Sequence, residues 1–473
     1  MPTLTVDVAV IGAGSAGLTA RRQAAKLGAS VVLIEHGPNG TTCARVGCMP
    51  SKLLIAAADA AWHVAEAGHF GVRVPAGVRI DGPAVLERVR AERDRFVSFV
   101  LDSLETIPAE QRLAGRARFV GPTTLQVDDH TRVEAKAVVI ATGASPTLPV
   151  SLQPLREHLL SSDAIFELRD LPASLGIIGT GVIGLELGQA LHRLGVRTML
   201  FSHSDRLATL TDPVVHEVAA RVLGAELDLH LSTTVDVTRT ADGFDIRWTD
   251  AAGTAREGRV DAVLYATGRH PNLAGLDLAR AGIRGIPAVD PHTMQCGTLP
   301  IFIAGDVAAY RPVLHEAVDE GRIAGANAAR YPDVRAHPRS TPLEIVFTAP
   351  NIATVGARYC ELDPTETEIG SVSYADQGRA RVMRENAGMV RIYARRDNGT
   401  LLGAEMFGPR VEHTAHLLAW AVQCGLTAAT ALDMPFYHPV VEEGIRTALR
   451  DLCARLRLQP PERPKDLECG PGV

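Results

Sequence analysis

The fold of this chain is decided by residues 5–17, which read TVDVAVIGAGSAG. Their apolar first half predicts a buried parallel strand, because such strands are covered on both faces and need not alternate. Three glycines follow at the next turn in a G-x-G-x-x-G pattern: Gly12, Gly14 and Gly17. A helix pattern then runs to Gly28, and residues 31–35, VVLIE, predict a second strand that ends in an acid. The segment therefore predicts a βαβ unit.

The glycine pattern has a physical use at the first turn of such a unit. Gly12 permits a tight turn, Gly14 lets the backbone approach a pyrophosphate, and Gly17 lets the helix and strand pack closely. The helix N-terminus favours negative charge, and Glu35 can accept hydrogen bonds from two ribose hydroxyls. A glycine-rich turn alone is weak evidence. Here the strand, the helix and the acid all stand where a dinucleotide site needs them.

The same pattern returns later in the chain without a gap. Residues 175–178 and 197–201 predict the two strands, and three glycines lie between them: Gly179, Gly181 and Gly184. One chain with two dinucleotide folds predicts two bound nucleotides. At the position of Glu35 the second copy has Ser202, followed by His203. The second site therefore lacks the acid that would repel a 2′-phosphate.

Three more strands end in small residues that suit a ligand-binding edge. VVIATG at 138–143 and VLYATG at 263–268 each predict a strand that ends at a tight crossing. The candidate cofactor contacts at these crossings are Thr142, Gly143, Gly268 and Arg269. IFIAGD at 301–306 places Asp306 just beyond a parallel strand, at the edge where ligands bind in such sheets. A helix N-cap is the alternative role for this acid.

The dinucleotide pattern stops at about residue 341. Beyond it, three strands (344–347, 389–393 and 401–407) and two helices (about 411–424 and 441–456) predict an α+β unit. We expect the first dinucleotide domain to span residues 1–150 together with 276–340, and the second to span 151–275. The C-terminal unit is expected at 341–473, with a loose tail after about residue 458.

Composition narrows the classes of function. The 473 residues are 46% hydrophobic, 22% charged and 4% aromatic, with a net charge of −6, which argues against a nucleic-acid surface. No apolar run is long enough to span a membrane, and the N-terminus runs directly into a strand pattern. Seven cysteines are too few for a disulfide scaffold. We expect a cytoplasmic protein without a metal site.

Two of the cysteines carry the strongest chemical signal. Cys43 and Cys48 stand in TTCARVGCMPSKLL, shortly after Glu35. In an ideal helix, residues five apart have Cα atoms about 8–9 Å apart, whereas a disulfide needs about 4.4–6.8 Å. Gly47 and Pro50 supply the distortion that a bridge between the two cysteines requires. The alternative is a pair of unrelated small core residues.

The chain resembles the class I FAD-dependent pyridine nucleotide-disulfide oxidoreductases, and among them the dihydrolipoamide dehydrogenases most. The motifs that carry the resemblance are GAGSAG, C-x₄-C-M-P-S-K, VVIATG, GTGVIG, ATGRHPN and IFIAGD, then TAPNIATVG at 348–356 and YHPVVEE at 437–443. The resemblance implies two Rossmann-like domains, for FAD and NAD(P), followed by a dimerisation domain. It also implies a homodimer.

The resemblance further implies roles for individual residues. The first three glycines, Glu35 and Asp306 would hold FAD. Cys48 would lie against the flavin, and Cys43 would exchange with the substrate. Lys52 would pair with Glu186 near the flavin. His438 would act as the acid/base towards the partner subunit's thiols, with Glu443 orienting it.

The implied reaction moves two electrons between dihydrolipoamide and NAD through FAD and the Cys43–Cys48 disulfide. NADP, another disulfide or an electrophile such as Hg(II) stays an alternative, as does a non-catalytic flavoprotein subunit or redox sensor. Three features depart from relatives. Phe436 replaces a frequent second His, Ser202 replaces an acid, and Cys469 is the single cysteine of the tail.

Overall fold

The computed structural model describes residues 1–75 and 77–458. It divides into two compact units, and each unit is built from two stretches of chain. Unit 1 comprises Met1–Pro172 and Ala262–Arg339, and unit 2 comprises Ala173–Asp261 and Ser340–Val473. The domain boundaries expected from the sequence stay predictions. The tail after residue 458, with Cys469, lies outside the described residues.

Unit 1 is built on the predicted βαβ unit. Its sheet has the order β3-β2-β1-β6-β5-β4, with β17 also paired to β6. The strands are β1 (Thr3–Ile11), β2 (Val31–Glu35), β3 (Arg112–Ala114), β4 (Ala117–Phe119), β5 (Thr124–Val127), β6 (Thr131–Ile140) and β17 (Ile301–Ile303). Strand β1 runs parallel to β2 and β6 and lies between them. The first turn therefore opens at the carboxyl end of a central strand, where ligands bind in such sheets.

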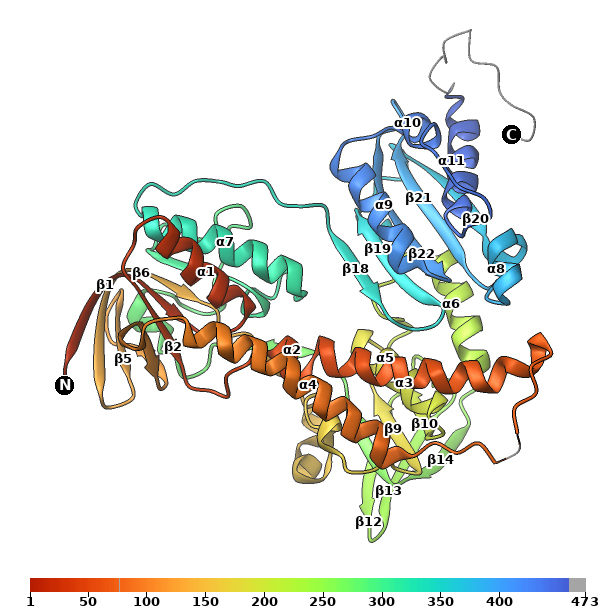
Figure 1. The fold of residues 1–473 in the computed structure, drawn as a ribbon, viewed down its shortest axis with the longest axis horizontal. Helices are drawn as coiled ribbons and strands as arrows, with labels where there is room; N and C mark the ends of the chain where they lie inside the picture. The colour runs from red at the N-terminus through yellow and green to blue at the C-terminus, as the bar shows by residue number, and fades with distance from the viewer. Residues whose placement is uncertain (76, 459–473) are drawn as a thin grey trace. The chain divides into compact units, whose positions relative to one another are not determined.

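Both faces of this sheet are buried, as the continuous apolar runs predict. Val8 and Val10 of β1 belong to the core under α1 and α7, whereas Ala9 and Ile11 belong to the core on the other face. The helices of unit 1 are α1 (Ser15–Lys26), α2 (Thr42–Val46), α3 (Cys48–Glu66), α4 (Gly82–Glu105) and α7 (Leu314–Arg330). In Figure 1, α1 and α7 lie side by side. Two short strand pairs complete the unit: β7 (Ala144–Pro146) with β16 (Arg269–Pro271), and β8 (Leu160–Ser161) with β15 (Ala262–Tyr265).

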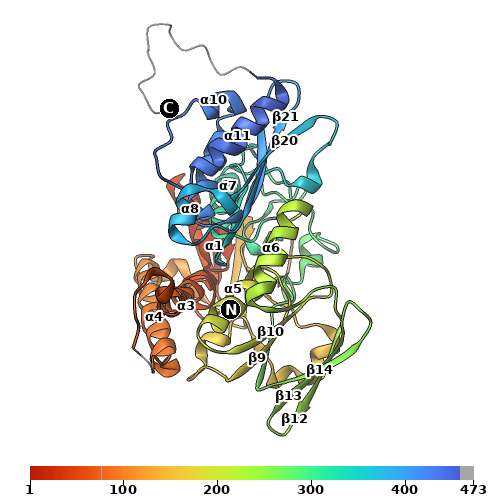
Figure 2. The same cartoon turned by 90° about the vertical axis from the view of Figure 1, so that its right-hand side faces the viewer.

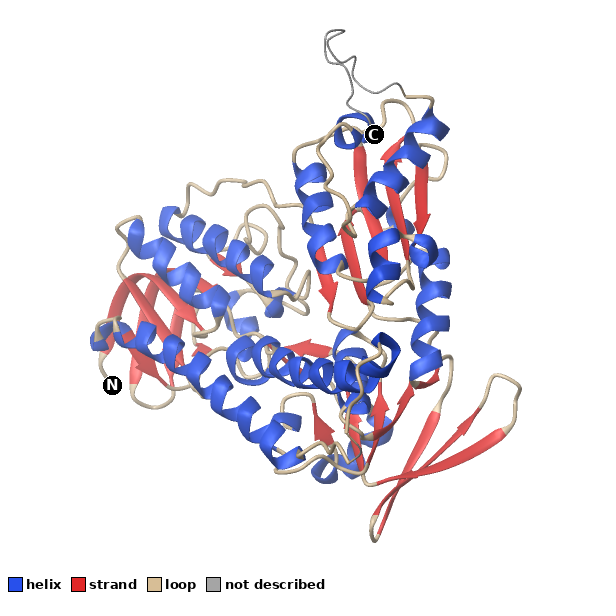
Figure 3. Ribbon diagram, turned by 45° about the vertical axis from the view of Figure 1, so that its right-hand side comes forward, coloured by secondary structure: helices blue, strands red, loops and turns tan. Residues whose placement is uncertain are grey.

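Unit 2 begins with the second copy of the pattern. The parallel strands β9 (Ser174–Ile178), β10 (Arg197–Phe201) and β11 (Asp228–His230) are accompanied by α5 (Val182–Arg193) and α6 (Pro213–Glu226). An antiparallel sheet of β12 (Val235–Thr240), β13 (Gly243–Thr249) and β14 (Ala255–Val260) follows. These three strands form the long red ribbon at the lower right of Figure 3.

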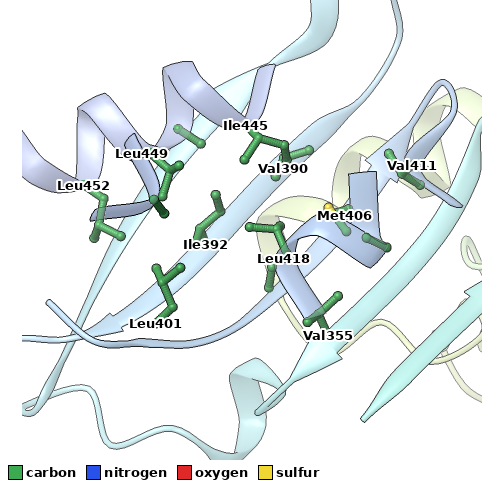
Figure 4. Close-up of a cluster of buried hydrophobic side chains, with 14 of the residues drawn as sticks. Val355, Val390, Ile392, Leu401, Met406, Val411, Leu418, Ile445, Leu449 and Leu452 are labelled. Carbon is green, nitrogen blue, oxygen red and sulfur yellow. The ribbon is translucent and has the colours of Figure 1, made fainter. Parts of the chain in front are cut away.

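The C-terminal part of unit 2 is the predicted α+β structure. Its antiparallel sheet has the order β18-β19-β22-β21-β20. The strands are β18 (Leu343–Val346), β19 (Asn351–Gly356), β20 (Thr367–Ser373), β21 (Met389–Arg395) and β22 (Leu401–Gly408), and the helices are α8 (Gly378–Met383), α9 (Val411–Gln423), α10 (Ala428–Leu432) and α11 (Glu443–Leu456). Figure 2 shows α11 along β20 and β21. Ile392, Leu418 and Leu449 meet in the core between sheet and helices (Figure 4).

Two fully buried carboxylates join the two parts of unit 2. Asp212, just before α6, accepts hydrogen bonds from Arg391 and from the hydroxyl of Tyr393, each at 2.9 Å. Glu405 of β22 accepts from the backbone N–H groups of Thr211 (2.7 Å) and Asp212 (2.8 Å). Buried charges are tolerated when they are bonded in this way. The part that contains α5 and α6 and the C-terminal sheet are therefore joined by buried hydrogen bonds within unit 2.

No helix among the described residues is long and apolar enough to cross a membrane.

Close contact of α1 and α7 depends on glycine. A Cβ atom on Gly321 would overlap the carbonyl oxygen of Ala16 and lie 3.0 Å from its Cα atom. We expect Gly321→Ala to lower the free energy of unfolding by about 1–3 kcal/mol, because backbone cannot yield as a side chain can. Thermal and urea unfolding followed by circular dichroism measure the change.

Gly224→Ala is the matched control. Gly224 also lies inside a helix, but a Cβ atom there would meet nothing within 4 Å. Its replacement should raise stability by about 0.5–1 kcal/mol, since alanine loses less backbone entropy on folding. Equal effects at the two positions would contradict the proposed packing.

Candidate active site

The first glycine turn has the geometry that a pyrophosphate needs. Gly12 has φ of +106° and lies against Ala141, so a larger residue is excluded there. Gly17 lies against the carbonyl oxygen of Gly12, which brings the helix onto the strand. Gly14 is the N-cap of α1 without a side-chain cap, and a Cβ atom at this position would meet nothing within 4 Å. The helix N-terminus therefore presents N–H groups to open space.

Glu35 is held against this turn. One carboxylate oxygen accepts from the backbone N–H of Ala13 at 2.7 Å, and the other accepts from that of Gly37 at 2.9 Å. A carboxylate offers about four lone-pair positions. Glu35 can therefore keep these bonds and still accept from ribose hydroxyls.

Asp306 stands beyond β17, as expected from the sequence. Burial raises the pKa of its carboxyl, and the charge of Arg269 opposes the rise. Its neighbour Gly305 has φ of +82°, in the region that favours glycine, and a Cβ atom there would lie 2.9 Å from that of Ala16. The turn that presents Asp306 is therefore built against α1.

A buried carboxylate on α7 holds the same turn. Glu320 is 1% exposed and accepts from the backbone N–H of Gly305 at 2.7 Å. Its other oxygen accepts from Arg339 at 3.2 Å, and Arg339 also pairs with Glu316. Burial raises the pKa of Glu320, against the lowering effects of the Gly305 N–H and Arg339. Glu320 thus fixes the peptide next to Asp306.

The two crossings predicted at the ATG segments meet in unit 1. The hydroxyl of Thr142 donates to the carbonyl of Asn272 at 2.7 Å. Arg269 donates to Asp163 at 2.8 Å and to the carbonyl of Ala144 at 2.7 Å. These two side chains tie the crossings together. Gly143 and Gly268 have φ of +67° and +99° at the same crossings. Cofactor contacts by these four residues stay predictions.

The second glycine turn repeats the first. Gly179 has φ of +115°, and Gly181 caps α5 with a Cβ position that meets nothing within 4 Å. Gly184 is buried in α5. Ser202 is only 7% exposed, and its hydroxyl accepts from the backbone N–H of Ser204 at 3.3 Å, whereas His203 is exposed. The Ser202 side chain is therefore turned into its own loop.

The cysteine segment contains the predicted helix distortion. Helix α2 ends at Val46 and α3 begins at Cys48, with Gly47 between them at φ −122° and ψ −113°. A Cβ atom on Gly47 would lie 3.1 Å from the carbonyl oxygen of Thr42. Cys43 and Cys48 are thiols whose side chains are hydrogen-bonded to each other. The break therefore brings the two sulfur atoms together.

The two thiols differ in their surroundings. The hydrogen bond with Cys48, then burial, raise the pKa of Cys43, while the charge of Lys52 opposes the rise. Cys48 is exposed and is the first residue of α3, where the helix N-terminus favours negative charge. Cys48 is therefore the more accessible of the two thiols.

His438 and Glu443 form a hydrogen-bonded pair. The Nδ1 atom of His438 lies 3.0 Å from Glu443 Oε1, and the backbone N–H of Val440 donates to Glu443 Oε2 at 3.2 Å. Burial disfavours ionisation of Glu443, but these two hydrogen bonds, together with the charges of His438 and Arg446, lower its pKa overall. The His438 side chain is 80% exposed. Its ring can therefore present Nε2 to a reacting group.

Lys52 lies in unit 1 and Glu186 in unit 2, so their pairing stays a prediction. Glu186 is 3% exposed, and its Oε1 accepts from the backbone N–H of Phe347 at 3.0 Å.

Comparison with known proteins places this geometry in a family. Residues 6–329 match the family described as pyridine nucleotide-disulphide oxidoreductase, and residues 343–449 match its dimerisation domain. The chain belongs to the pyridine nucleotide-disulphide oxidoreductase family. Its membership implies FAD and NAD(P) as cofactors, and the matched dimerisation domain supports a homodimer. The predicted family and fold class are thus confirmed.

Individual relatives are of several kinds. Dihydrolipoyl dehydrogenase of Bacillus subtilis is 30% identical over 460 residues, which cover 94% of this chain and 98% of the relative. Mercuric reductase of Bacillus cereus is 30% identical over 457 residues, covering 94% of this chain and 71% of the relative. The crystal structure of LpdA from Mycobacterium tuberculosis superimposes with a TM-score of 0.79 at 26% identity, covering 94% of this chain and 99% of that one.

Unit 1 fits FAD on its own geometry. The open, uncapped N-terminus of α1 suits a pyrophosphate. Glu35 at the same turn suits a ribose, and the partly buried carboxyl of Asp306 suits hydroxyl donors. These residues would hold the cofactor, which supplies reversible two-electron chemistry when bound.

The sequence did not lead us to predict a role for Glu320 at the site. Its signal was available, because Glu316 and Glu320 stand on the same helix face as the buried alanines and glycines of α7. Acids at buried helical positions need a partner. The partner, the backbone N–H of Gly305, could not be inferred from the spacing.

The contact between Glu320 and Gly305 predicts an effect on flavin binding. Gly305 and Arg339 donate to different oxygens of Glu320. Glutamine has an oxygen at only one of these two positions, so in Glu320→Gln one of the two donors loses its acceptor. A hydrogen bond to a charged group is worth about 1.5–3 kcal/mol. We therefore expect FAD to bind at least about tenfold more weakly, as measured by flavin fluorescence after removal and titration of FAD.

Glu316→Gln is the control for this variant. Glu316 is equally buried and pairs with the same guanidinium, but no hydrogen bond joins it to Gly305 in the described structure. Its FAD affinity should stay within about twofold of the parent, less than one hydrogen bond is worth. A similar loss in both variants would show a general effect of the charge cluster.

Proposed function

We propose that this protein is a dihydrolipoyl dehydrogenase that passes two electrons from dihydrolipoamide to NAD. The observation that carries the proposal is the pair of hydrogen-bonded thiols, Cys43 in α2 and Cys48 at the start of α3. A second site with a free imidazole nitrogen, at His438, supplies a proton carrier. The Bacillus subtilis relative of the same activity adds support.

The thiol step is an exchange between two dithiol/disulfide pairs. One substrate thiolate attacks the Cys43 sulfur of the oxidised pair, and the Cys43–Cys48 bond breaks with its electron pair left on Cys48. The second substrate thiolate then displaces Cys43. The substrate becomes a disulfide, and the cysteines hold the two electrons.

His438 carries the protons of this exchange. Glu443 holds Nδ1, so Nε2 is the nitrogen free to accept a proton from a substrate thiol. In the homodimer, the His438 of one subunit serves the cysteines of the other. FAD, held by the first glycine turn, Glu35 and Asp306, would supply the two-electron chemistry that links the thiols to the nicotinamide.

We infer that NAD is the better nucleotide, with modest discrimination against NADP. Ser202 stands where an acid would repel a 2′-phosphate, and its hydroxyl is engaged by Ser204. Exposed His203 and Arg206 follow it, without a cluster of arginines. This loop therefore does not select strongly between the 2′-hydroxyl of NAD and the 2′-phosphate of NADP.

A second candidate is a reductase of Hg(II), favoured by the Bacillus cereus relative. Cys469 as the single tail cysteine weighs against it. The protein's cytoplasmic location is part of the proposal, as is its dithiol substrate.

One assay panel tests the proposal. Purified holoenzyme is given lipoamide, glutathione disulfide or Hg(II), each with NADH and with NADPH, and kcat/KM is measured for every pair. We expect lipoamide with NADH to be the best combination, with the preference over NADPH below about a thousandfold, or roughly 4 kcal/mol. A higher kcat/KM for glutathione disulfide or Hg(II), or a clear preference for NADPH, would contradict this function.

A further inference from the structure

The loop that carries His438 is short and exposed. It joins α10 to α11. The His438 side chain is 80% exposed, so little packing holds the ring in place. Its orientation depends instead on the carboxylate of Glu443. That carboxylate also accepts from the backbone N–H of Val440, at 3.2 Å. The peptide plane before Val440 is therefore part of the same small network.

The peptide plane after Val440 is held from another part of the chain. The side-chain Nε2 of Gln377 donates to the carbonyl oxygen of Val440 at 2.7 Å. Gln377 precedes α8 and caps it, because its Oε1 accepts from the backbone N–H of Ala380 at 2.6 Å. Both ends of the Gln377 amide are thus engaged, and its cap bond fixes which end faces Val440.

The segment that presents Gln377 is itself well anchored. Tyr374 is fully buried, and its hydroxyl donates to the carbonyl oxygen of Val441 at 3.4 Å. The backbone N–H of Gln377 donates to the carbonyl oxygen of Tyr374 at 3.1 Å. A Cβ atom on Gly444 would lie 2.8 Å from the Tyr374 hydroxyl. The loop therefore rests on a rigid support.

We propose that Gln377 is a positioning residue for the His438–Glu443 pair and acts through the backbone of Val440. The inference rests on the proposed function, in which His438 carries the proton of the thiol step. With both peptide planes at Val440 held, the Val440 N–H stays directed at Glu443. Glu443 in turn stays directed at His438 Nδ1. Without the Gln377 donor, the peptide plane after Val440 is free to rotate. The hydrogen bonds from Val440 to Glu443 and from Glu443 to His438 are then held less firmly.

Gln377→Ser tests this role with little damage to α8. Serine is a good N-cap, so Ala380 keeps an acceptor, but the shorter side chain cannot reach Val440. We expect reduction of the enzyme by dihydrolipoamide to slow by about two- to tenfold, the range that one hydrogen bond is worth. Reduction by NADH, which does not need His438, should be unchanged. Stopped-flow absorbance of the flavin measures both steps.

Two further variants accompany it. Ser373→Ala removes a neighbouring cap, at the backbone N–H of Ala375, and leaves the bonds of Val440 intact, so both steps should keep the parent rates. Gln377→Glu keeps the length and the capping oxygen but lacks the donor, and it replaces Gln377→Ser if that protein does not fold. Equal slowing of both steps in the Gln377 variants would indicate general damage and overturn the proposal.

A double-mutant cycle with His438→Ala separates positioning from other effects. If Gln377 acts through His438, then Gln377→Ser should cause no further loss in the His438→Ala background. The same loss in both backgrounds, or normal thiol chemistry in Gln377→Ser, would overturn the role of Gln377. A His438→Ala enzyme with full thiol activity would instead remove the proposed proton carrier, and the positioning role with it.

Discussion

The chemistry proposed for this protein depends on one interruption of a helix. Between Cys43 and Cys48 the backbone leaves the helical path at Gly47, and the two sulfur atoms meet. An unbroken helix would hold the two Cα atoms about 8–9 Å apart, beyond the reach of a disulfide. Gly47 lies so near the carbonyl of Thr42 that a Cβ atom would crowd it. A glycine is therefore part of the proposed redox centre.

Unit 1 uses glycines where two backbone segments pack closely together. Helix α1 packs on its strand through Gly17 and on α7 through Gly321, and its N-terminus opens at Gly14. The turn that presents Asp306 is held by Glu320, which accepts from the backbone N–H of Gly305. The residues that would touch FAD are thus supported by a second layer whose members do not touch it. Unit 2 uses the same arrangement at Gly179 and Gly181, and then adds the pair of His438 and Glu443.

The glycine turns, the cysteine pair and the C-terminal α+β unit were predictable because their signals are local. G-x-G-x-x-G after an apolar strand leaves few alternatives, and Gly47 followed three residues later by Pro50 indicates a distorted helix. The partners of Glu320 and Gln377 were not predictable. Each bonds to a backbone group supplied by folding, and neither spacing nor composition records which one. Ser202 illustrates the same limit, because its position was predicted but the inward turn of its hydroxyl was not.

Anaerobic titration with dithionite tests the central claim most directly, that Cys43 and Cys48 form a redox pair beside the flavin. The holoenzyme should accept about four electrons per subunit, two for FAD and two for the disulfide. A long-wavelength absorption band, from the Cys48 thiolate to the flavin, should appear near the midpoint. Cys43→Ser is the control and should accept about two electrons, since it cannot form the bridge. An uptake of only two electrons by the parent enzyme, in the absence of that band, would contradict the account.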